Sequence, residues 1–465
     1  MQSLLCRNVK VLGFNTNNAG GLTVMKNAEK KNSILAVTTT CCLRKIRRIV
    51  IRPLLPVVCC CSCFLVPISS FLFPIPSYAV ETIPYFNASV LGGQYFFGSQ
   101  EGAVSGNISA VTSASMKLSP EFVLIPLYSG KYQGTKNVTD IVGGGTLFQE
   151  AMDHRIAVKG VYEYAPELKF KPEIGFKWYL LKETRDEKWG KGLFDYQKPS
   201  FSLETEFLYN DPFSIRLGYD LFKMSFLNYT SLESQIGATD GSMAREMSGS
   251  EVLNSMNHNF SLAGNADMGG SVVEMGIGYL MRGYNEQHVV NSIGQFDSDK
   301  RSDTTSSVNF NWKFPNKTAG GLRIIPGMGF GLAFNRSNQN NYDAQRVTFI
   351  SNYYNYDRAS FGLDLGISVP SKVKDSFTNF RFNAGLTRTN YGDRPVQDEA
   401  GLYETGRVAN DELVFGGSVT YPIIPAFNWM ASMQYGKQFS NMKYEKLYKY
   451  NFNVMTYLVG FTYEY

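Results

Sequence analysis

Cysteine is confined to the start of this 465-residue chain, because all seven cysteines fall within the first 63 residues. The remainder therefore carries no disulfide framework and no thiolate metal site. Histidine is almost as scarce: His154, His258 and His288 are the only three, and none stands in a recognisable catalytic spacing. We expect no enzyme activity, no cofactor and no metal. Catalysis by His154 beside Asp153, or by His258 with nearby serines, is the weaker alternative.

Charge is also sparse, at 18% of residues against roughly 25% in soluble domains. Residues 1–79 hold ten Lys/Arg and one acid, which leaves 35 basic and 39 acidic residues beyond them, a net charge of −4. The overall charge of +5 thus comes from the first 79 residues. A net positive charge that comes only from the first 79 residues does not indicate nucleic-acid binding, and we expect no nucleic-acid partner.

Residues 1–79 contain the three parts of a secretory signal. A basic cluster at 44–52 precedes an apolar run from Leu54 to Phe73, and the small-residue site Ser77-Tyr78-Ala79 follows. We therefore predict a cleavable signal peptide that ends at Ala79 and a mature domain of residues 80–465. A transmembrane anchor is the alternative, since the run approaches the ~20 residues that a bilayer needs, but two prolines lie within the run and three more flank it.

Beyond Ala79 no apolar run reaches 18 residues, so the predicted mature domain offers no transmembrane helix. Its clearest pattern is strict alternation. In Leu168–Leu180 every second residue is apolar or proline, and the residues between them are mostly charged. In Leu322–Phe334 every second residue is again apolar or proline, and three of the six intervening residues are glycine. Only helices and closed sheets satisfy all backbone groups in lipid, so this pattern indicates a membrane β-barrel with a wet interior.

The sequence predicts an all-β, transmembrane, antiparallel up-and-down barrel of about sixteen strands, with fourteen to eighteen possible. Short turns alternate with long connections at 183–198, 227–257, 284–303, 338–358 and 391–411, as in barrels with short periplasmic turns and long outer loops. Aromatic residues gather near the short-turn ends, as a lipid-interface girdle requires. The expected strands are 87–97, 105–117, 121–130, 152–164, 168–182, 199–209, 212–226, 258–266, 271–283, 304–314, 321–337, 359–369, 376–390, 412–421, 427–438 and 451–465.

The last strand ends with an aromatic or aliphatic residue at every second position, and Gly460 stands five residues before the final aromatic. This resembles the terminal strand signal of Gram-negative outer-membrane β-barrel proteins, although Leu458 stands where that pattern usually has a polar residue. The resemblance implies recognition by the barrel assembly machinery and export through the inner membrane to the outer membrane. The residues of this expected assembly signal are Tyr457, Val459, Gly460, Phe461, Tyr463 and Tyr465.

The polar positions of the alternating strands should face the lumen. Charge rings in a water-filled pore tune which ions pass, and the lysines on 152–164 and 168–182 predict a basic stripe on one wall. Groups that merely fill the interior and pair with one another are an equally good interpretation. The expected lumen-lining residues are Lys159, Lys169, Lys171, Glu173, Lys177, Glu204, Glu206, Arg216, Asp220, Glu274, Arg282, Arg323, Asp364 and Arg381.

These patterns favour a porin-like channel for passive diffusion of small hydrophilic solutes or ions. The alternative is a non-conducting surface or adhesion barrel that binds partners through its long loops. Loop 227–257 could fold into the lumen, and Ser250 could cap a short helix there. Outer-membrane lipid and lipopolysaccharide are the expected surroundings. The sequence leaves open whether the barrel is a monomer or a homo-oligomer.

Overall fold

The structure, a computed structural model, describes residues 80–98, 103–139, 146–182, 186–209, 213–229, 251–343, 346–445 and 450–465. None of these residues forms a helix that could span a membrane. All regular elements in these ranges are β-strands. They are β1 (Glu81–Phe97), β2 (Ala103–Lys117), β3 (Phe122–Thr139), β4 (Thr146–Ala165), β5 (Leu168–Lys182), β6 (Tyr196–Tyr209), β7 (Phe213–Phe226), β8 (Ser255–Met268), β9 (Ser271–Val290), β10 (Phe296–Lys313), β11 (Lys317–Ala319), β12 (Leu322–Ser337), β13 (Asn341–Asp343), β14 (Thr348–Ile350), β15 (Tyr356–Pro370), β16 (Phe377–Gln397), β17 (Tyr403–Ile424), β18 (Phe427–Ser440) and β19 (Phe452–Glu464).

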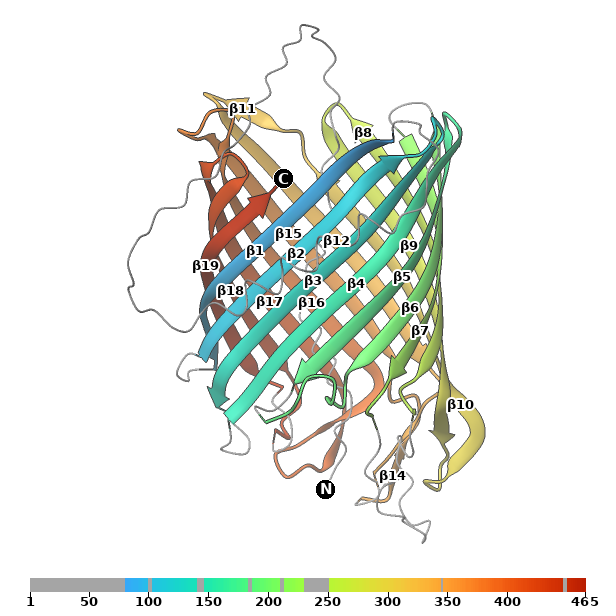
Figure 1. The fold of residues 1–465 in the computed structure, drawn as a ribbon. Helices are drawn as coiled ribbons and strands as arrows, with labels where there is room; N and C mark the ends of the chain where they lie inside the picture. The colour runs from blue at the N-terminus through green and yellow to red at the C-terminus, as the bar shows by residue number, and fades with distance from the viewer. Residues whose placement is uncertain are drawn as a thin grey trace, which may run out of the picture. The chain divides into compact units, whose positions relative to one another are not determined.

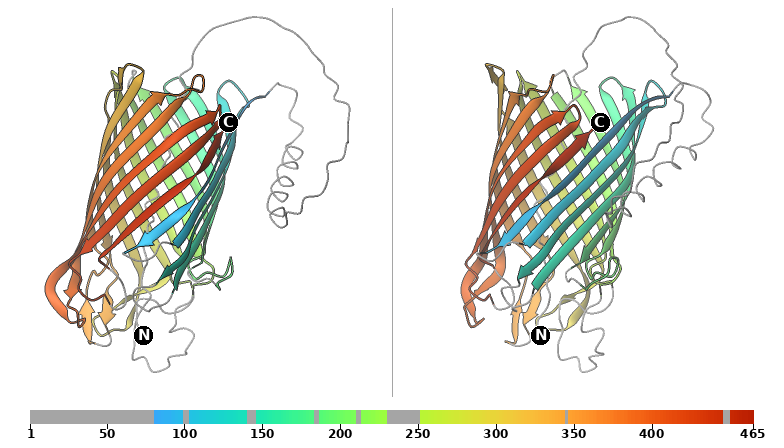
Figure 2. Two further views of the ribbon diagram at one scale, coloured as in Figure 1. Left: turned by 90° about the vertical axis from the view of Figure 1, so that its left-hand side faces the viewer. Right: turned by 60° about the vertical axis from the view of Figure 1, so that its left-hand side comes forward.

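Sixteen long strands close into one antiparallel barrel: β1 to β10, β12, and β15 to β19. Each strand pairs with its neighbour in the chain, and the last pairs with the first, from Asn87 opposite Glu464 to Phe97 opposite Val454. The strands run obliquely around the wall (Figure 1), and the turned views show blue β1 beside red β19 at this closing seam (Figure 2). The predicted up-and-down barrel of sixteen strands is confirmed.

Short turns join the strands at one end of the barrel. Between β8 and β9 the turn is Gly269-Gly270, with φ of +64° and +84°, a conformation that favours glycine and matches the twist of a hairpin. The first residue of β1 and the end of β19 lie at this same end, which Figure 1 shows at the top with the C-terminus. We assign it to the periplasmic side, because outer-membrane barrels have their short turns there.

Two of the predicted long loops are wrong. Residues 284–303 and 391–411 form extensions of the β9–β10 and β16–β17 hairpins, joined by the short connections 291–295 and 398–402. Register shifts occur in both extensions. Beyond the membrane a strand faces water on both sides, so its residues need not alternate between apolar and polar. The alternation that located the other strands therefore stops before these strands end.

The short helix expected after Ser250 is also wrong, because the described residues 251–254 are not helical. Glu251 has a φ of +62°, which belongs to no right-handed helix. Backbone hydrogen bonding from Asn254 to the Glu251 carbonyl closes a turn instead, and β8 begins one residue later. Most of loop 227–257 lies outside the described residues. The expectation that this loop enters the lumen therefore stays a prediction.

Residues 338–355, which we call the mouth segment, carry the small hairpin of β13 and β14 at the long-connection end (Figure 1). The buried side chain of Gln339 accepts hydrogen bonds from the backbone nitrogens of Val290 and Asn340 and donates one to the His288 carbonyl. A small apolar core of Val396, Val408 and Met442 lies at this end as well. The ends of the hairpins are therefore packed structure.

Candidate functional site on the inner wall

The two faces of the barrel wall differ sharply in chemistry. On the outer face large apolar side chains stand exposed, such as Ile174 at 68% and Leu217 at 56%. On the other face Arg216 of β7 reaches Glu274 of β9 at 2.7 Å. Side chains two strands apart can meet in this way on the concave side, so this second face is the inner one. A closed barrel with an apolar outer belt is the architecture of outer-membrane proteins.

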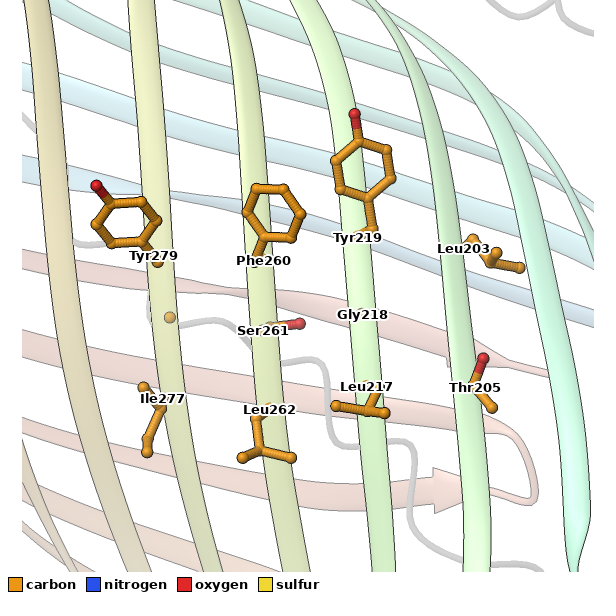
Figure 3. Close-up of a pocket in the computed structure, with 11 residues that line it drawn as sticks. Leu203, Thr205, Leu217, Gly218, Tyr219, Phe260, Ser261, Leu262, Ile277 and Tyr279 are labelled. Carbon is orange, nitrogen blue, oxygen red and sulfur yellow. The ribbon is translucent and has the colours of Figure 1, made fainter.

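The outer wall carries a shallow apolar groove of about 430 Å³ over β6 to β9. Figure 3 shows the rings of Tyr219, Phe260 and Tyr279 turned toward one end and the aliphatic side chains of the next row toward the other. Its lining is almost entirely apolar, which suits contact with acyl chains. The polar groups that could handle a hydrophilic solute lie on the opposite face of the same strands.

All fourteen residues expected to line the lumen lie on the inner face, because each shares the alternation of that face on its strand. Several are joined by ion pairs. Arg381 Nε lies 2.8 Å from Asp364 across β15 and β16, while Asp220 accepts a hydrogen bond from Asn259 and Arg282 donates one to Asn257. Lys159 and Arg323 have no ion pair within the described residues.

The basic stripe predicted from Lys159, Lys169, Lys171 and Lys177 needs correction because the last three of these lysines pair with carboxylates. Lys171 Nζ lies 2.9 Å from both Glu204 and Glu206. Lys169 pairs with Glu163 at 3.5 Å, and Lys177 pairs with Asp153 at 2.5 Å. The lysine pattern on one strand was visible in the sequence, but the carboxylates come from neighbouring strands. Their register decides the local charge.

Sequence reasoning missed Lys198 as a residue of the wall. The predicted sixth strand began at residue 199, whereas β6 begins at Tyr196 and places Lys198 on its inner face. The alternation of Lys198, Ser200 and Ser202 with outer-face residues was the signal that could have extended the strand. Lys177 lies directly opposite Lys198 in the register of β5 and β6.

The terminal assembly residues lie at the closing seam. Tyr457, Val459 and Phe461 point outward with 37–47% of their surface exposed. Leu458, which departs from the usual pattern, faces inward with 6% exposure. At Gly460 a Cβ would collide with the main chain of Val90, so the glycine is needed for the close approach of β19 to β1. Whether the assembly machinery reads these residues stays a prediction.

The three histidines do not come together. His154 and His258 lie on the outer face, where their Nδ1 atoms share hydrogen bonds with the hydroxyls of Tyr128 at 3.1 Å and Tyr219 at 2.9 Å. His288 Nδ1 lies 2.8 Å from the Asp297 carbonyl in the β9–β10 hairpin. Within the described ranges no three His, Cys, Asp or Glu residues gather as a metal site would need.

Asp303 of the β9–β10 hairpin is part of a buried ion pair. Asp303 receives the Arg301 guanidinium through two hydrogen bonds of 3.0 and 2.8 Å. That guanidinium lies between the rings of Tyr284 and Tyr354, at 4.6 and 4.1 Å. Tyr354 belongs to the mouth segment, so this buried cluster joins the segment to the hairpin.

Together the apolar outer face and the closed sheet give the chain the architecture of an outer-membrane β-barrel. No protein-family model and no curated protein matches the sequence. Among solved structures, OmpT of Vibrio cholerae is similar at 13% identity and a TM-score of 0.39, covering 84% of this chain and 99% of that one.

OccD3 of Pseudomonas aeruginosa is similar at 9% identity and a TM-score of 0.42, covering 82% of this chain and 91% of that one. OccAB3 of Acinetobacter baumannii has 8% identity and the same TM-score, with 82% and 99% covered. Values this low do not carry a function across, so the function proposed below rests on this chain's own residues.

Proposed function

We propose that the chain is a porin-like channel that lets small hydrophilic solutes or ions diffuse passively across the outer membrane. The observation that carries the proposal is the polar inner face of a sixteen-stranded barrel. Barrels of 16–18 strands leave an aqueous channel, and a wall lined with ion pairs such as Arg216–Glu274 belongs in water rather than in a dry core. The proposal assigns no catalysis to the chain.

The test is planar-bilayer conductance of the full-length chain, expressed in a Gram-negative host and extracted from its outer membrane. A channel should give stable current steps and a reversal potential in a salt gradient. Heat-modifiable mobility in electrophoresis serves as the control that the barrel is folded. Folded, inserted protein that gives no steps would overturn the channel and leave the barrel.

A surface-binding function is the second candidate, and the long-connection end favours it. Ile293, Val347 and Leu402 stand at the tips of three hairpins with 68%, 74% and 60% of their surface exposed. The tips are neighbours: the Tyr403 hydroxyl donates to Asp343 Oδ2 at 2.8 Å, which links β17 to the hairpin of β13 and β14. Val347 also has a φ of +50°, which is unfavourable for a β-branched residue.

Replacing the three exposed tip residues by Ser tests this candidate. If the tips bind a partner, cells that display the parent chain should adhere to a surface that carries this partner. Cells that display the variant should lose this adhesion while the barrel stays folded and inserted. A variant that adheres like the parent chain would remove the support that the tips give. Conductance of the same variant reports on the channel independently.

We also propose that the outer rim contacts lipopolysaccharide. Outer-face charges gather where β12 and β15 to β18 leave the apolar belt: Arg336 pairs with Asp357 at 2.7 Å, and Arg388 with Asp411 at 3.8 Å. Cations at this level suit the phosphates of the outer leaflet. Replacing Arg388 by Gln should reduce co-purified lipopolysaccharide, and unchanged lipid content would count against the contact.

A further inference from the structure

Three cations stand side by side on the inner wall. In the register of β4, β5 and β6, Arg155 lies opposite Lys177, and Lys177 lies opposite Lys198. Like charges directly opposite each other destabilise a sheet, so such a row needs compensation. Carboxylates compensate only part of this positive charge. The cation that they leave uncompensated indicates what the row can bind.

Carboxylates serve the first two cations only. Arg155 pairs with Glu173, and Lys177 pairs with Asp153. Lys198 has no ion pair within the described residues, and its Nζ lies 3.7 Å from the ring centroid of Phe222 instead. Arg282 is a further cation near Lys198 and Asp220 a further carboxylate, so the four cations stand against the three carboxylates Glu173, Asp153 and Asp220. The wall around Lys198 thus carries a surplus of positive charge.

Aromatic rings lie next to this surplus on its extracellular side. Tyr179, Tyr196 and Phe226 occupy the next inner-face positions of β5, β6 and β7 and lie opposite one another. The rings of Tyr179 and Tyr196 stack with centroids 5.0 Å apart, and those of Tyr196 and Phe226 lie 5.5 Å apart. Lys198 is therefore a cation between Phe222 on one side and this aromatic row on the other.

We propose that Lys198 and the aromatic row of Tyr179, Tyr196 and Phe226 form a binding site for small aromatic anions on the lumen wall. The ammonium group of Lys198 would take the charged group of the solute, and the aromatic row would stack with its ring. A site that needs both parts distinguishes aromatic anions from small inorganic anions and from neutral aromatic molecules. The inference rests on the proposed channel for access to the lumen, although the binding itself does not require conduction.

The test uses benzenesulfonate, whose charge does not change with pH. Titration calorimetry on the full-length protein in detergent should show binding of benzenesulfonate, with methanesulfonate and benzenesulfonamide both much weaker because each lacks one of the two parts. Lys198→Gln should weaken benzenesulfonate binding about tenfold or more, the worth of one charge-assisted hydrogen bond. Tyr196→Leu should weaken it about threefold.

Lys437→Gln is the matched control. Lys437 also lies over a phenylalanine ring, with 4.5 Å to the centroid of Phe439, but it is on the outer face, so this variant should bind benzenesulfonate as the parent protein does. Heat-modifiable mobility confirms that each variant is folded. Equal binding of methanesulfonate and benzenesulfonate, or an unchanged affinity in Lys198→Gln, would overturn the site.

Failure of the site and failure of the channel are distinguishable. Current steps without calorimetric binding would keep the channel and remove the aromatic-anion site. Binding without current steps would keep the site and remove the channel. Where both hold, benzenesulfonate should interrupt single-channel currents, and Lys198→Gln should shorten the interruptions.

Discussion

Replacing Arg301 by Ala is expected to release the mouth segment while the barrel stays intact. The Arg301 and Asp303 side chains are only 6% and 7% exposed, and removing one partner of a buried ion pair costs about 3–5 kcal/mol. The stacking of the guanidinium on Tyr354 is lost as well. Because 1.4 kcal/mol corresponds to a factor of ten, amide exchange in residues 346–355 should accelerate by at least about a hundredfold.

The control for this prediction is Arg336→Ala, which removes the same kind of pair at the surface. Arg336 and Asp357 are each 53% exposed, and exposed pairs contribute about 0–1 kcal/mol. Hydrogen exchange followed by mass spectrometry measures both variants, with the exchange of β5 as an internal reference. An acceleration below about tenfold in Arg301→Ala, or one equal to that of Arg336→Ala, would refute the role of the buried cluster.

Three further predictions follow from the seam, the mouth segment and the leader. Gly460→Ala should lower the temperature at which the folded band disappears in electrophoresis, whereas no shift would show that the seam tolerates a Cβ there. Burial raises the pKa of Asp343, but hydrogen bonds from Tyr403 and Arg346 outweigh it and leave that pKa lowered; burial and the bond to Asp343 raise the pKa of Tyr403. The lowered pKa of Asp343 stabilises the folded mouth segment, and this stability is lost as pH falls below 3.8. The raised pKa of Tyr403 also stabilises it, and this stability is lost as pH rises above 10.0. The protease resistance of the mouth segment should therefore not change with pH between these limits, and a change near pH 7 would contradict this. N-terminal sequencing of the exported protein should begin with Val80, and a start before the apolar run Leu54–Phe73 would favour the anchor.

The sequence located the barrel strands well because lipid imposes a strict alternation on them. The strand predicted at 168–182 has the bounds of β5, and most of the others differ mainly by extension at the outer end. There the pattern no longer reports strand pairing, as the hairpin extensions of 284–303 and 391–411 show. The small hairpin of β13 and β14 carried no separate signal, since its strands have three residues each.

The candidate site was predictable in placement but not in charge. Alternation decides which residues face inward, and it placed Lys171 and Lys177 on the correct face. It does not reveal which residues of neighbouring strands lie opposite. Glu204 and Glu206 neutralise Lys171 only because β5 and β6 pair in one particular register, and no pattern within a single strand encodes that.

The same alternation limits what lumen charge can mean. A strand that crosses lipid cannot afford charged residues on its outer face, so the charges it carries within the apolar belt lie inside whatever their use. The number of lumen charges is therefore weak evidence for ion selectivity. Which of these charges are paired with an opposite charge is stronger evidence. Lys171, held between two carboxylates, adds little net field, whereas Lys198 faces other cations. Since Lys198 lies near the extracellular end of β6, an anion that enters from outside meets it before the neutralised wall, and Lys198→Gln should shift the reversal potential toward cations more than Lys171→Gln does.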